Sequence, residues 1–253
     1  SLEQIRLEKL HGLRAEGHEP YPTRAERTHT SLEAIRLFEE SEAQGVPAAV
    51  TVTLAGRLRP MRPMGKITFA HIEDGDGRIQ LFLRANDVGE EALDLFNREF
   101  DLGDFIQAKG EMFRTRTGEV TLRVHSFHML AKAITPLPAA KDEVVDGQVV
   151  RHATLADPEM RYRQRYADLA VNPEVRQIFR LRAATTRALR EFLDQHGFVE
   201  VETPILQPIY GGAAAQPFTT HHNQLKQDLY LRFSLEFCFN LSVWAAWGVC
   251  FGR

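Results

Sequence analysis

The first part of the chain carries apolar residues at the three- and four-residue spacing of amphipathic helices. Apolar positions up to Leu13 share one face, and Gly17 follows as a residue that can end a helix in the left-handed conformation. A second helix is predicted from Thr30 to Gly45, because Glu33 stands three residues after Thr30 and completes a capping box. The pattern therefore predicts a solvated helical arm at the N-terminus.

The next part of the chain alternates apolar and polar residues with the period of two that is typical of half-buried strands. Strands are predicted near residues 50–54, 67–72, 79–83, 105–113 and 120–130. An acidic helix is predicted over 87–100, between the third and fourth strands. Three strands, a helix and two more strands is the order of the OB-fold, a five-stranded Greek-key barrel, although other small barrels share this order.

Beyond the barrel the pattern changes twice. Residues 135–158 contain prolines and a glycine with little periodicity, which indicates a linker. A long helix is then predicted to begin at Pro173, where the missing N–H is tolerated, and to be closed by Gly197. Residues 198–203 alternate as a strand does, and Pro204 ends that strand.

The pattern therefore predicts an α+β fold class and divides the chain into four parts. These parts are a helical arm at 1–49, a five-stranded OB-fold β-barrel with flanking helices at 50–134, a linker at 135–158 and a second domain at 159–253.

Composition places the chain among globular proteins. Of its 253 residues, 43% are hydrophobic and 26% are charged, which excludes a disordered tail, a collagen-like fibre and a disulfide-stapled miniprotein. Cys238 and Cys250 have no second ligand at metal-binding spacing, so they are interpreted as buried thiols of a reducing compartment. Residues 233–251 approach the length of a membrane span, but Glu236 interrupts them, so they are interpreted as a buried core element.

The net charge of −3 hides local clusters of one sign. Residues 50–72 contain no acidic residue and four basic ones, which are Arg57, Arg59, Arg62 and Lys66. Phe69 lies in the same stretch, and Gln80 lies on the next predicted strand. A basic side, an aromatic ring and an amide are what recognition of single-stranded RNA uses. A core phenylalanine and a solvated glutamine fit the same pattern, so both interpretations stay open at this point.

A second basic stretch lies in the predicted second domain. Residues 161–190 contain eight arginines and only two acidic residues, Asp168 and Glu174. Helical spacing places several of these arginines near one face. The stretch is interpreted either as a surface for a polyanion or as an ion-paired subunit contact.

Short runs along the chain carry a family resemblance. In the barrel they are Met64-Gly65-Lys66-Ile67-Thr68-Phe69, Gly77-Arg78-Ile79-Gln80-Leu81, Asp101-Leu102-Gly103-Asp104 and Thr115-Arg116-Thr117-Gly118-Glu119. After it they are residues 161–169, Gly197-Phe198-Val199-Glu200-Val201-Glu202-Thr203-Pro204, Gly211-Gly212-Ala213-Ala214-Ala215 and Thr220-His221-His222-Asn223. In this order they resemble the N-terminal portion of bacterial class II lysyl-tRNA synthetases. The resemblance implies an anticodon-binding barrel followed by the first part of an antiparallel α/β catalytic domain with class II motif 1.

The resemblance also implies roles for five barrel residues. Phe69 is expected to stack on an anticodon base, and Gln80 and Glu119 are expected to hydrogen-bond a uracil edge. Arg62 and Lys66 are expected to hold phosphates.

For the second domain the resemblance implies a lysine site and a dimer interface. Gly212 is expected to approach lysine through its backbone, Glu236 to receive an ammonium group, and Pro204 to lie at the interface of a homodimer. Lysine, ATP and the lysine tRNA are the implied partners, Mg²⁺ accompanies ATP, and neither DNA nor a membrane is expected. The implied location is the cytoplasm. No catalytic residue and no metal ligand is assigned within this chain.

The second domain also departs from the family pattern. Lys226 stands where the family has aspartate, and residues 237–251 are more apolar than expected. The final run, 251–253, resembles the start of motif 2, while the motif 2 arginine, the metal-binding acidic residues and motif 3 have no counterpart. We therefore expect a lysine–tRNA ligase sequence that does not aminoacylate as this polypeptide alone. The alternatives are a non-catalytic fragment that binds tRNA and dimerises, and an aspartyl- or asparaginyl-type synthetase.

Overall fold

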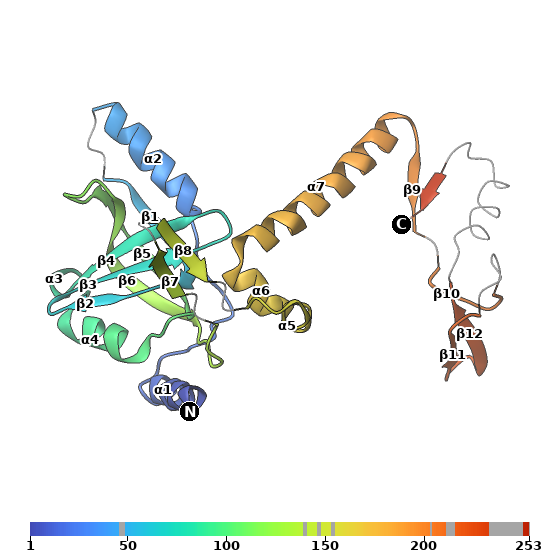
Figure 1. Ribbon diagram of the computed structural model, residues 1–253, viewed down its shortest axis with the longest axis horizontal. Coiled ribbons are helices and arrows are strands. Elements are labelled where there is room, and N and C mark those ends of the chain that lie inside the picture. The colour runs from blue at the N-terminus through green and yellow to red at the C-terminus, as the bar shows by residue number, and fades with distance from the viewer. Residues whose placement is uncertain are drawn as a thin grey trace. The chain divides into compact units, whose positions relative to one another are not determined.

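A computed structural model (Figure 1) describes residues 1–45, 49–138, 141–145, 148–152, 155–202, 204–210, 216–232 and 250–252. Within these ranges, side chains are described except at 141–145, 148–152 and 250–252. The chain forms two compact units, Ser1–Ala156 and Asp157–Arg253.

Both helices predicted for the N-terminal arm are confirmed. Helix α1 spans Leu2–Ala15 and helix α2 spans Ser31–Ala43. The Thr30 hydroxyl accepts a hydrogen bond from the Glu33 N–H, and the Glu33 carboxylate accepts one from the Thr30 N–H, so the predicted capping box is formed.

Six strands form the main sheet of the first unit. They are β1 (Thr51–Leu58), β2 (Arg62–Met64), β3 (Ile67–Glu73), β4 (Arg78–Arg84), β5 (Phe105–Arg114) and β6 (Val120–Ala131). Their order is β1-β5-β6-β4-β3-β2, and β1 also pairs with β3, so five strands close a barrel and β2 extends β3. This barrel confirms the predicted OB-fold. The sequence pattern does not predict β2, because its three residues are all exposed and show no alternation.

The barrel closes where β1 meets β3, through the pairs Arg57↔Glu73 and Leu58↔Ile72. A Cβ atom on Gly56 would lie 2.9 Å from the Glu73 carbonyl oxygen, so the two backbones approach too closely for any other residue. The inward positions of the strands fill the core with aliphatic side chains: Val52, Leu54, Leu58, Ala70, Ile72, Ile79, Leu81, Leu83, Ile106, Leu122 and Val124.

The helix between the third and fourth predicted strands is in fact two helices. Helix α3 covers Ala85–Val88 and helix α4 covers Glu90–Glu99. The prediction of one helix over 87–100 is wrong at Gly89, whose φ of 94° interrupts the helix. Helix α4 buries Leu93 and Phe96 in the core of the barrel.

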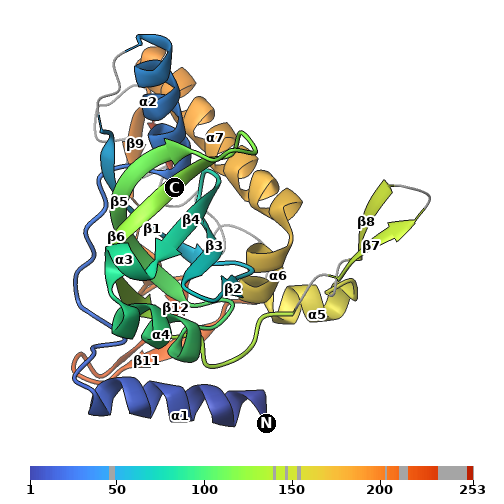
Figure 2. The same cartoon turned by 90° about the vertical axis from the view of Figure 1, so that its left-hand side faces the viewer.

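A cluster of ion pairs, buried at Lys132 and partly exposed at Lys9, links the arm to the barrel, and α1 lies beside α4 (Figure 2). The fully buried ammonium group of Lys132 donates to Asp101 at 2.5 Å and to Asp104 at 2.8 Å, and Lys9 of α1 donates to Asp101 at 2.7 Å. Burial by itself raises the pKa of Asp101, but the hydrogen bonds from Lys132 and Lys9 outweigh it and hold that pKa below its usual value.

The stretch interpreted as a linker contains a β-hairpin. Strands β7 (Lys141–Val145) and β8 (Gln148–His152) pair antiparallel within residues 135–158. The sequence holds a signal for this hairpin, because Asp-Gly stands between two valine-containing runs, and that dipeptide is typical of two-residue hairpin turns.

The second unit opens with three helices, α5 (Pro158–Arg163), α6 (Arg165–Val171) and α7 (Pro173–Gln195). The predicted long helix is therefore confirmed, and Gly197 follows it with a φ of 80°. The carboxylate of Asp168 is buried and accepts hydrogen bonds from Arg161, Arg165 and Asn172. These bonds fix the corner between α5, α6 and the start of α7.

Short strands follow α7 in the same unit. They are β9 (Val199–Val201), β10 (Leu206–Gln207), β11 (Thr219–His222), β12 (Gln227–Leu231) and β13 (Cys250–Gly252). Strands β10, β12 and β11 form an antiparallel sheet, and β9 pairs with β13 in parallel. The predicted strand at 198–203 is therefore present over Val199–Val201.

Among the described helices, none combines the length and apolarity needed to cross a bilayer. Residues 233–249, which make up most of the apolar stretch considered in the sequence, lie outside the described residues.

Candidate nucleic-acid interface

The outer face of strands β3 and β4 carries the residues singled out in the barrel. Along both strands, buried positions alternate with partly exposed ones, so Phe69 and His71 share the outer face of β3, and Gln80 and Phe82 share that of β4. Antiparallel pairing places Phe69 opposite Phe82, and His71 opposite Gln80. The four side chains therefore lie together on one face of the barrel.

The turn between these two strands is anchored to the arm. The carboxylate of Asp74 accepts hydrogen bonds from the N–H groups of Asp76 and Gly77 within the turn, and from the N–H and hydroxyl of Ser31 at the start of α2. Burial by itself raises the pKa of Asp74, but these hydrogen bonds outweigh it and lower that pKa below its usual value. The strands that carry the outer face are thus held at one end by the arm.

Three aromatic rings lie in a row on this face. The ring centroids of Phe69 and Phe82 are 5.1 Å apart at an interplanar angle of 42°, and those of Phe82 and Phe113 are 5.8 Å apart at 61°. Neighbouring rings hold Phe69 in place while it remains partly exposed. A partly exposed aromatic ring is a platform on which an unpaired base can stack.

Beside the rings, four polar side chains form a hydrogen-bonded cluster. The Gln80 Nε2 donates to the Glu119 Oε2 at 2.8 Å, and the Gln80 Oε1 accepts from the Thr121 hydroxyl at 2.9 Å. The His71 Nε2 lies 3.3 Å from the other oxygen of the Glu119 carboxylate. The structure therefore brings Phe69, Gln80 and Glu119 together on one face.

The imidazole of His71 is half-buried in this cluster. Burial lowers the pKa of His71 below its ordinary value, and the positive charge of Arg78 lowers it further, while the hydrogen bond to Glu119 acts in the opposite direction. Because a carboxylate only accepts hydrogen bonds, the nitrogen that faces Glu119 is the one that carries the proton.

Cations are present at the rim of this face. Arg62 lies on β2 directly opposite Phe69, and its side chain is exposed. Lys66 is exposed as well and donates to Glu90 at 2.7 Å, a hydrogen bond that raises the pKa of Lys66 above its usual value. Two exposed cations beside a partly exposed ring are an arrangement that can hold an RNA phosphate near a stacked base.

Fewer of the basic residues at 50–72 are free to contact RNA than the sequence indicates. Arg59 donates to Glu73 at 2.8 Å and is mostly buried, while the guanidinium of Arg57 lies 4.3 Å from the centre of the Phe105 ring. These two arginines have partners within the barrel, which the one-dimensional count of charges does not reveal. Only part of the predicted basic side, at Arg62 and Lys66, is therefore exposed.

Sequence reasoning missed four members of this face: His71, Phe82, Phe113 and Thr121. The alternation along strands holds a signal for two of them, because His71 is two residues from Phe69, and Phe82 is two residues from Gln80. Thr121 reaches the face through the parallel pairing of β4 with β6, in which it lies opposite Gln80. That pairing joins strands distant in sequence, so no local pattern predicts it.

The residues predicted for the second domain are only partly described. Gly212 and Glu236 lie outside the described residues, so their expected roles toward lysine stay predictions. Pro204 is described and exposed, between β9 and β10.

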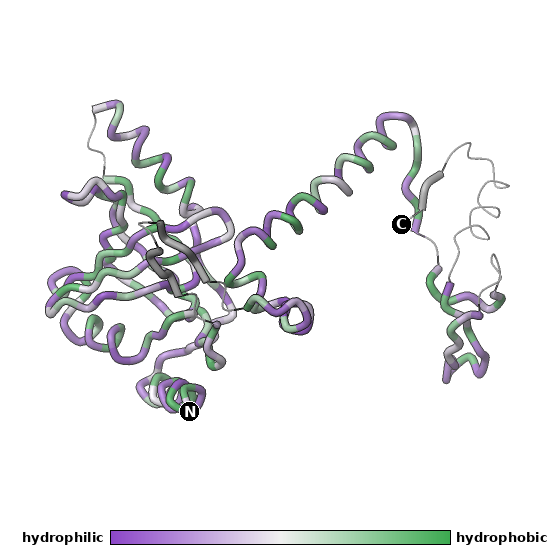
Figure 3. Tube along the Cα trace, in the orientation of Figure 1, coloured by the Kyte–Doolittle hydropathy of each residue, from purple (hydrophilic) through white to green (hydrophobic). Residues whose placement is uncertain are grey.

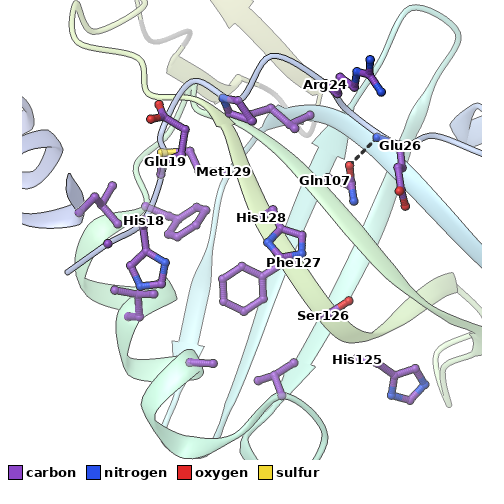
Figure 4. Close-up of a pocket in the computed structure, with 18 residues that line it drawn as sticks. His18, Glu19, Arg24, Glu26, Gln107, His125, Ser126, Phe127, His128 and Met129 are labelled. Carbon is purple, nitrogen blue, oxygen red and sulfur yellow. Dashed lines mark hydrogen bonds between the residues drawn. The ribbon is translucent and has the colours of Figure 1, made fainter. Parts of the chain in front are cut away.

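A separate cavity of about 680 Å³ lies on another side of the first unit (Figure 4). It is lined by the segment after α1, including His18 and Glu19, and by residues of β6 such as Phe127 and Met129, which also border the core. The N–H of Glu26 donates to the Gln107 Oε1 at 2.7 Å beside it. None of the residues of the polar cluster lines this cavity.

Comparison with known proteins gives matches along most of the chain. Residues 52–130 match the family described as OB-fold nucleic acid binding domain, and residues 157–251 match the family described as tRNA synthetases class II (D, K and N). A lysine–tRNA ligase of Roseiflexus castenholzii is 50% identical over 93% of this chain and 45% of that relative. Those of Pelotomaculum thermopropionicum and Carboxydothermus hydrogenoformans are 49% and 48% identical over 93% of this chain, and over 43% and 44% of their own lengths. The chain thus spans less than half the length of the curated relatives it matches.

Proposed function

Because the chain belongs with the class II lysyl-tRNA synthetases in sequence, we propose that it works as part of a lysine–tRNA ligase whose barrel binds the anticodon of the lysine tRNA. The observation that carries this proposal is the placing of Phe69, Gln80 and Glu119 on one outer face of the barrel. An unpaired base needs a ring to stack on and polar groups that reach its edge, and this face offers both.

The proposed mode of binding assigns a task to each of the predicted residues. Phe69 stacks on an anticodon base, and the Gln80–Glu119 pair meets the edge of a uracil. Arg62 and Lys66 hold phosphates of the anticodon loop, and Lys66 exchanges the Glu90 carboxylate for a phosphate when RNA arrives. Both carboxylate and phosphate are anions, so this exchange keeps the lysine paired.

The test is a binding titration of the full chain with an RNA hairpin that carries a UUU anticodon loop. Replacing the ring by Phe69→Ala is expected to weaken binding by about 1–3 kcal/mol, the typical worth of one stacked base. Phe105→Ala removes another exposed ring of the barrel, one covered by Arg57, and serves as the matched control with no expected effect. Equal affinity for the UUU hairpin and for hairpins with unrelated loops would contradict the proposal.

Lysine and ATP are the small-molecule substrates of the proposed ligase, with Gly212 and Glu236 facing lysine. Among the described residues there is no group of three or more histidine, cysteine, aspartate or glutamate side chains able to hold a metal ion, so no Mg²⁺ ligand is assigned to them. Thermal unfolding with added lysine is the test of the lysine site. Lysine is expected to raise the melting temperature, aspartate and asparagine are not, and Glu236→Gln is expected to remove the shift.

A second copy of the chain is the proposed partner of α7, and the cytoplasm is the proposed location. Along α7, one face carries four exposed apolar side chains: Ile178 at 58%, Leu181 at 68%, Leu189 at 59% and Phe192 at 58%. A contiguous apolar face of this kind is typical of a surface that another protein covers. Pro204, exposed in the same unit, is proposed to lie at the same interface.

Sedimentation velocity over a range of protein concentrations tests this assembly. Leu181→Asp places a charge on the apolar face and is expected to shift the chain toward monomers. Arg187→Asp, on the opposite side of the same helix, is the control and is expected to leave the monomer–dimer equilibrium near that of the parent. A parent chain that stays monomeric at every concentration would contradict the proposed dimer.

A further inference from the structure

We infer that Thr121, Glu119 and His71 are positioning residues that hold the Gln80 amide in one orientation, and that this orientation makes the barrel accept uracil and reject cytosine. The inference rests on the proposed anticodon binding and deepens it. It assigns tasks to Thr121 and His71, and it makes Glu119 act on the base through Gln80.

The orientation of the amide follows from the chemistry of its neighbours. Glu119 offers Gln80 a carboxylate oxygen, which accepts hydrogen bonds and donates none, so the amide must turn its NH₂ group toward Glu119 across the 2.8 Å contact. The amide oxygen then faces the Thr121 hydroxyl, which donates to it across 2.9 Å. The inverted amide would set two oxygen atoms at hydrogen-bond distance with no proton between them.

Glu119 is itself held at its other carboxylate oxygen. The ring of His71 lies 3.3 Å from that oxygen and is half-buried on the neighbouring strand, directly opposite Gln80. The Thr121 side chain is fully buried, so its hydroxyl has little freedom to turn toward solvent. The Thr121 hydroxyl also lies 3.3 Å from the Glu119 backbone carbonyl, so the Glu119 carboxylate fixes the direction of the amide and the Thr121 hydroxyl completes the arrangement.

The held amide keeps one N–H and one oxygen lone pair for a ligand. The free N–H of the amide can donate to the O4 of a uracil, while the amide oxygen accepts from the neighbouring N3–H of the same base. Cytosine presents the reverse order, because its N4 amino group donates and its N3 accepts. A cytosine in the same stacked position would thus require the inverted amide, which the Glu119 carboxylate opposes.

The experiment compares two RNA hairpins that differ by one base. The full chain is titrated with a UUU-loop hairpin and with the same hairpin carrying cytosine at one anticodon position, tested at each position in turn. The parent chain is expected to prefer uracil at one position by roughly 5- to 150-fold, the range of one well-made bidentate contact. Gln80→Ala is expected to lose this preference together with affinity for the UUU hairpin.

The positioning variants are expected to change the ratio of the two affinities. Glu119→Gln replaces an acceptor-only group by an amide that can meet Gln80 in either orientation, so the preference is expected to fall toward equality while the hairpin still binds. Thr121→Val, which removes the hydroxyl with little change of shape, is expected to lower the preference several-fold. Thr121→Ser restores the hydroxyl and is expected to restore the preference. His71→Ala, which frees one carboxylate oxygen, is expected to give a smaller loss.

The outcomes separate this inference from the proposed function. If the parent discriminates and Phe69→Ala weakens binding, but Glu119→Gln and Thr121→Val keep the parental ratio, the positioning inference is overturned and anticodon binding stands. If the parent shows no preference for uracil over cytosine at any position but still binds the UUU hairpin more tightly than unrelated loops, the positioning inference fails and anticodon binding stands. Equal affinity for all hairpins overturns both. Melting temperatures of the variants are measured alongside, and Glu119→Gln keeps the test decisive if Thr121→Val unfolds.

Discussion

The two units of the chain place their apolar residues differently. In the barrel, strand alternation sends aliphatic side chains inward, where Leu81, Ile106 and Leu122 have no exposure. In the second unit, α7 alternates apolar and polar residues along its length (Figure 3), yet most of its large apolar side chains stay exposed. Alternating apolar and polar residues therefore give a buried core in the barrel and an exposed apolar face on α7.

The difference lies in how each unit covers its apolar side. A barrel curls a single sheet until its inward face covers itself, and α4 closes one end with Phe96. A single helix cannot cover its own apolar stripe, because every residue on that stripe points the same way. Four predictions break or sharpen this contrast, beginning with the largest expected effect.

Lys132→Met tests how much the buried Lys132–Asp104 ion pair contributes to the stability of the first unit. The substitution leaves the buried carboxylate of Asp104 without its cation, so the free energy of unfolding is expected to fall by about 3–5 kcal/mol. Hydrogen exchange of the β5 and β6 amides across a urea series measures the loss. Lys9→Met, which removes a partly exposed pair with Asp101, is the control and is expected to cost about 0–1 kcal/mol. Equal losses in both variants would argue that burial of the Lys132–Asp104 pair makes it no more important than the partly exposed Lys9–Asp101 pair.

Leu81→Ala and Leu181→Ala make the comparison with one residue type. Leu81 is fully buried on β4, so its truncation is expected to cost about 2–5 kcal/mol through lost burial and a cavity. Leu181 is mostly exposed on α7, so truncation is expected to change the stability of the monomer by less than about 0.5 kcal/mol. Urea unfolding of both variants at low protein concentration is the measurement. A large loss for Leu181→Ala under these conditions would mean that α7 is covered within the monomer.

Gly110→Ala tests the packing of the longest strand pair in the barrel. A Cβ at this position would lie 1.9 Å from the carbonyl oxygen of Arg123, so the backbones of β5 and β6 must move apart, at a cost of about 1–3 kcal/mol or more. Gly12→Ala in α1, where nothing lies within 4 Å, is the control and is expected to stabilise by up to about 1 kcal/mol. The melting temperatures of both variants are the measurement. A similar fall in both would contradict a strain that is local to Gly110.

The smallest effect concerns pH. Because the pKa of His71 is lower in the folded chain than the ordinary imidazole value of about 6.5, the unfolded state binds the proton more readily. The stability linked to His71 is thus fully present above that value and is lost as the pH falls below it. Replacing the ring by His71→Asn is expected to reduce the loss of melting temperature between pH 7.5 and 5.5. If the melting temperatures of parent and variant fall equally between pH 7.5 and 5.5, His71 is not the group that titrates. The charged groups that act on the His71 ring are Arg78 and Arg62, which lower its pKa, and Glu119, which raises it.

Local signals in the sequence predict the two arm helices, five strands of the barrel, and α7 and β9 of the second unit. The capping box at Thr30, the proline at the start of α7 and the alternation along β3 and β4 each act within a few residues, and the structure confirms the elements that they predict. The hairpin of β7 and β8 was missed although its Asp-Gly dipeptide is a turn signal, and two further errors depend on a single residue or a short run. Gly89 splits one predicted helix into two, and β2 is too short to show a pattern.

The candidate site was predictable to a lesser degree. Phe69, Gln80 and Glu119 could be named from the resemblance, and their common face follows from the strand register. The contacts of Thr121 with Gln80, and of Arg59 with Glu73, join positions 41 and 14 residues apart. Such partners depend on how strands pair in three dimensions, which sequence patterning does not specify.

The seam at which β1 meets β3 has a consequence for the outer face. Its register pairs are Arg57↔Glu73 and Leu58↔Ile72, extended by the hydrogen bond from the Arg59 N–H to the His71 carbonyl, whereas β5 and β6 pair along most of their length. Local opening of the barrel therefore requires the least free energy where β1 pairs with β3. Phe69, Gln80 and Thr121 lie on β3, β4 and β6, whose mutual pairing does not pass through β1. A barrel in which β1 has separated from β3 would therefore still hold these three side chains in the same positions relative to one another.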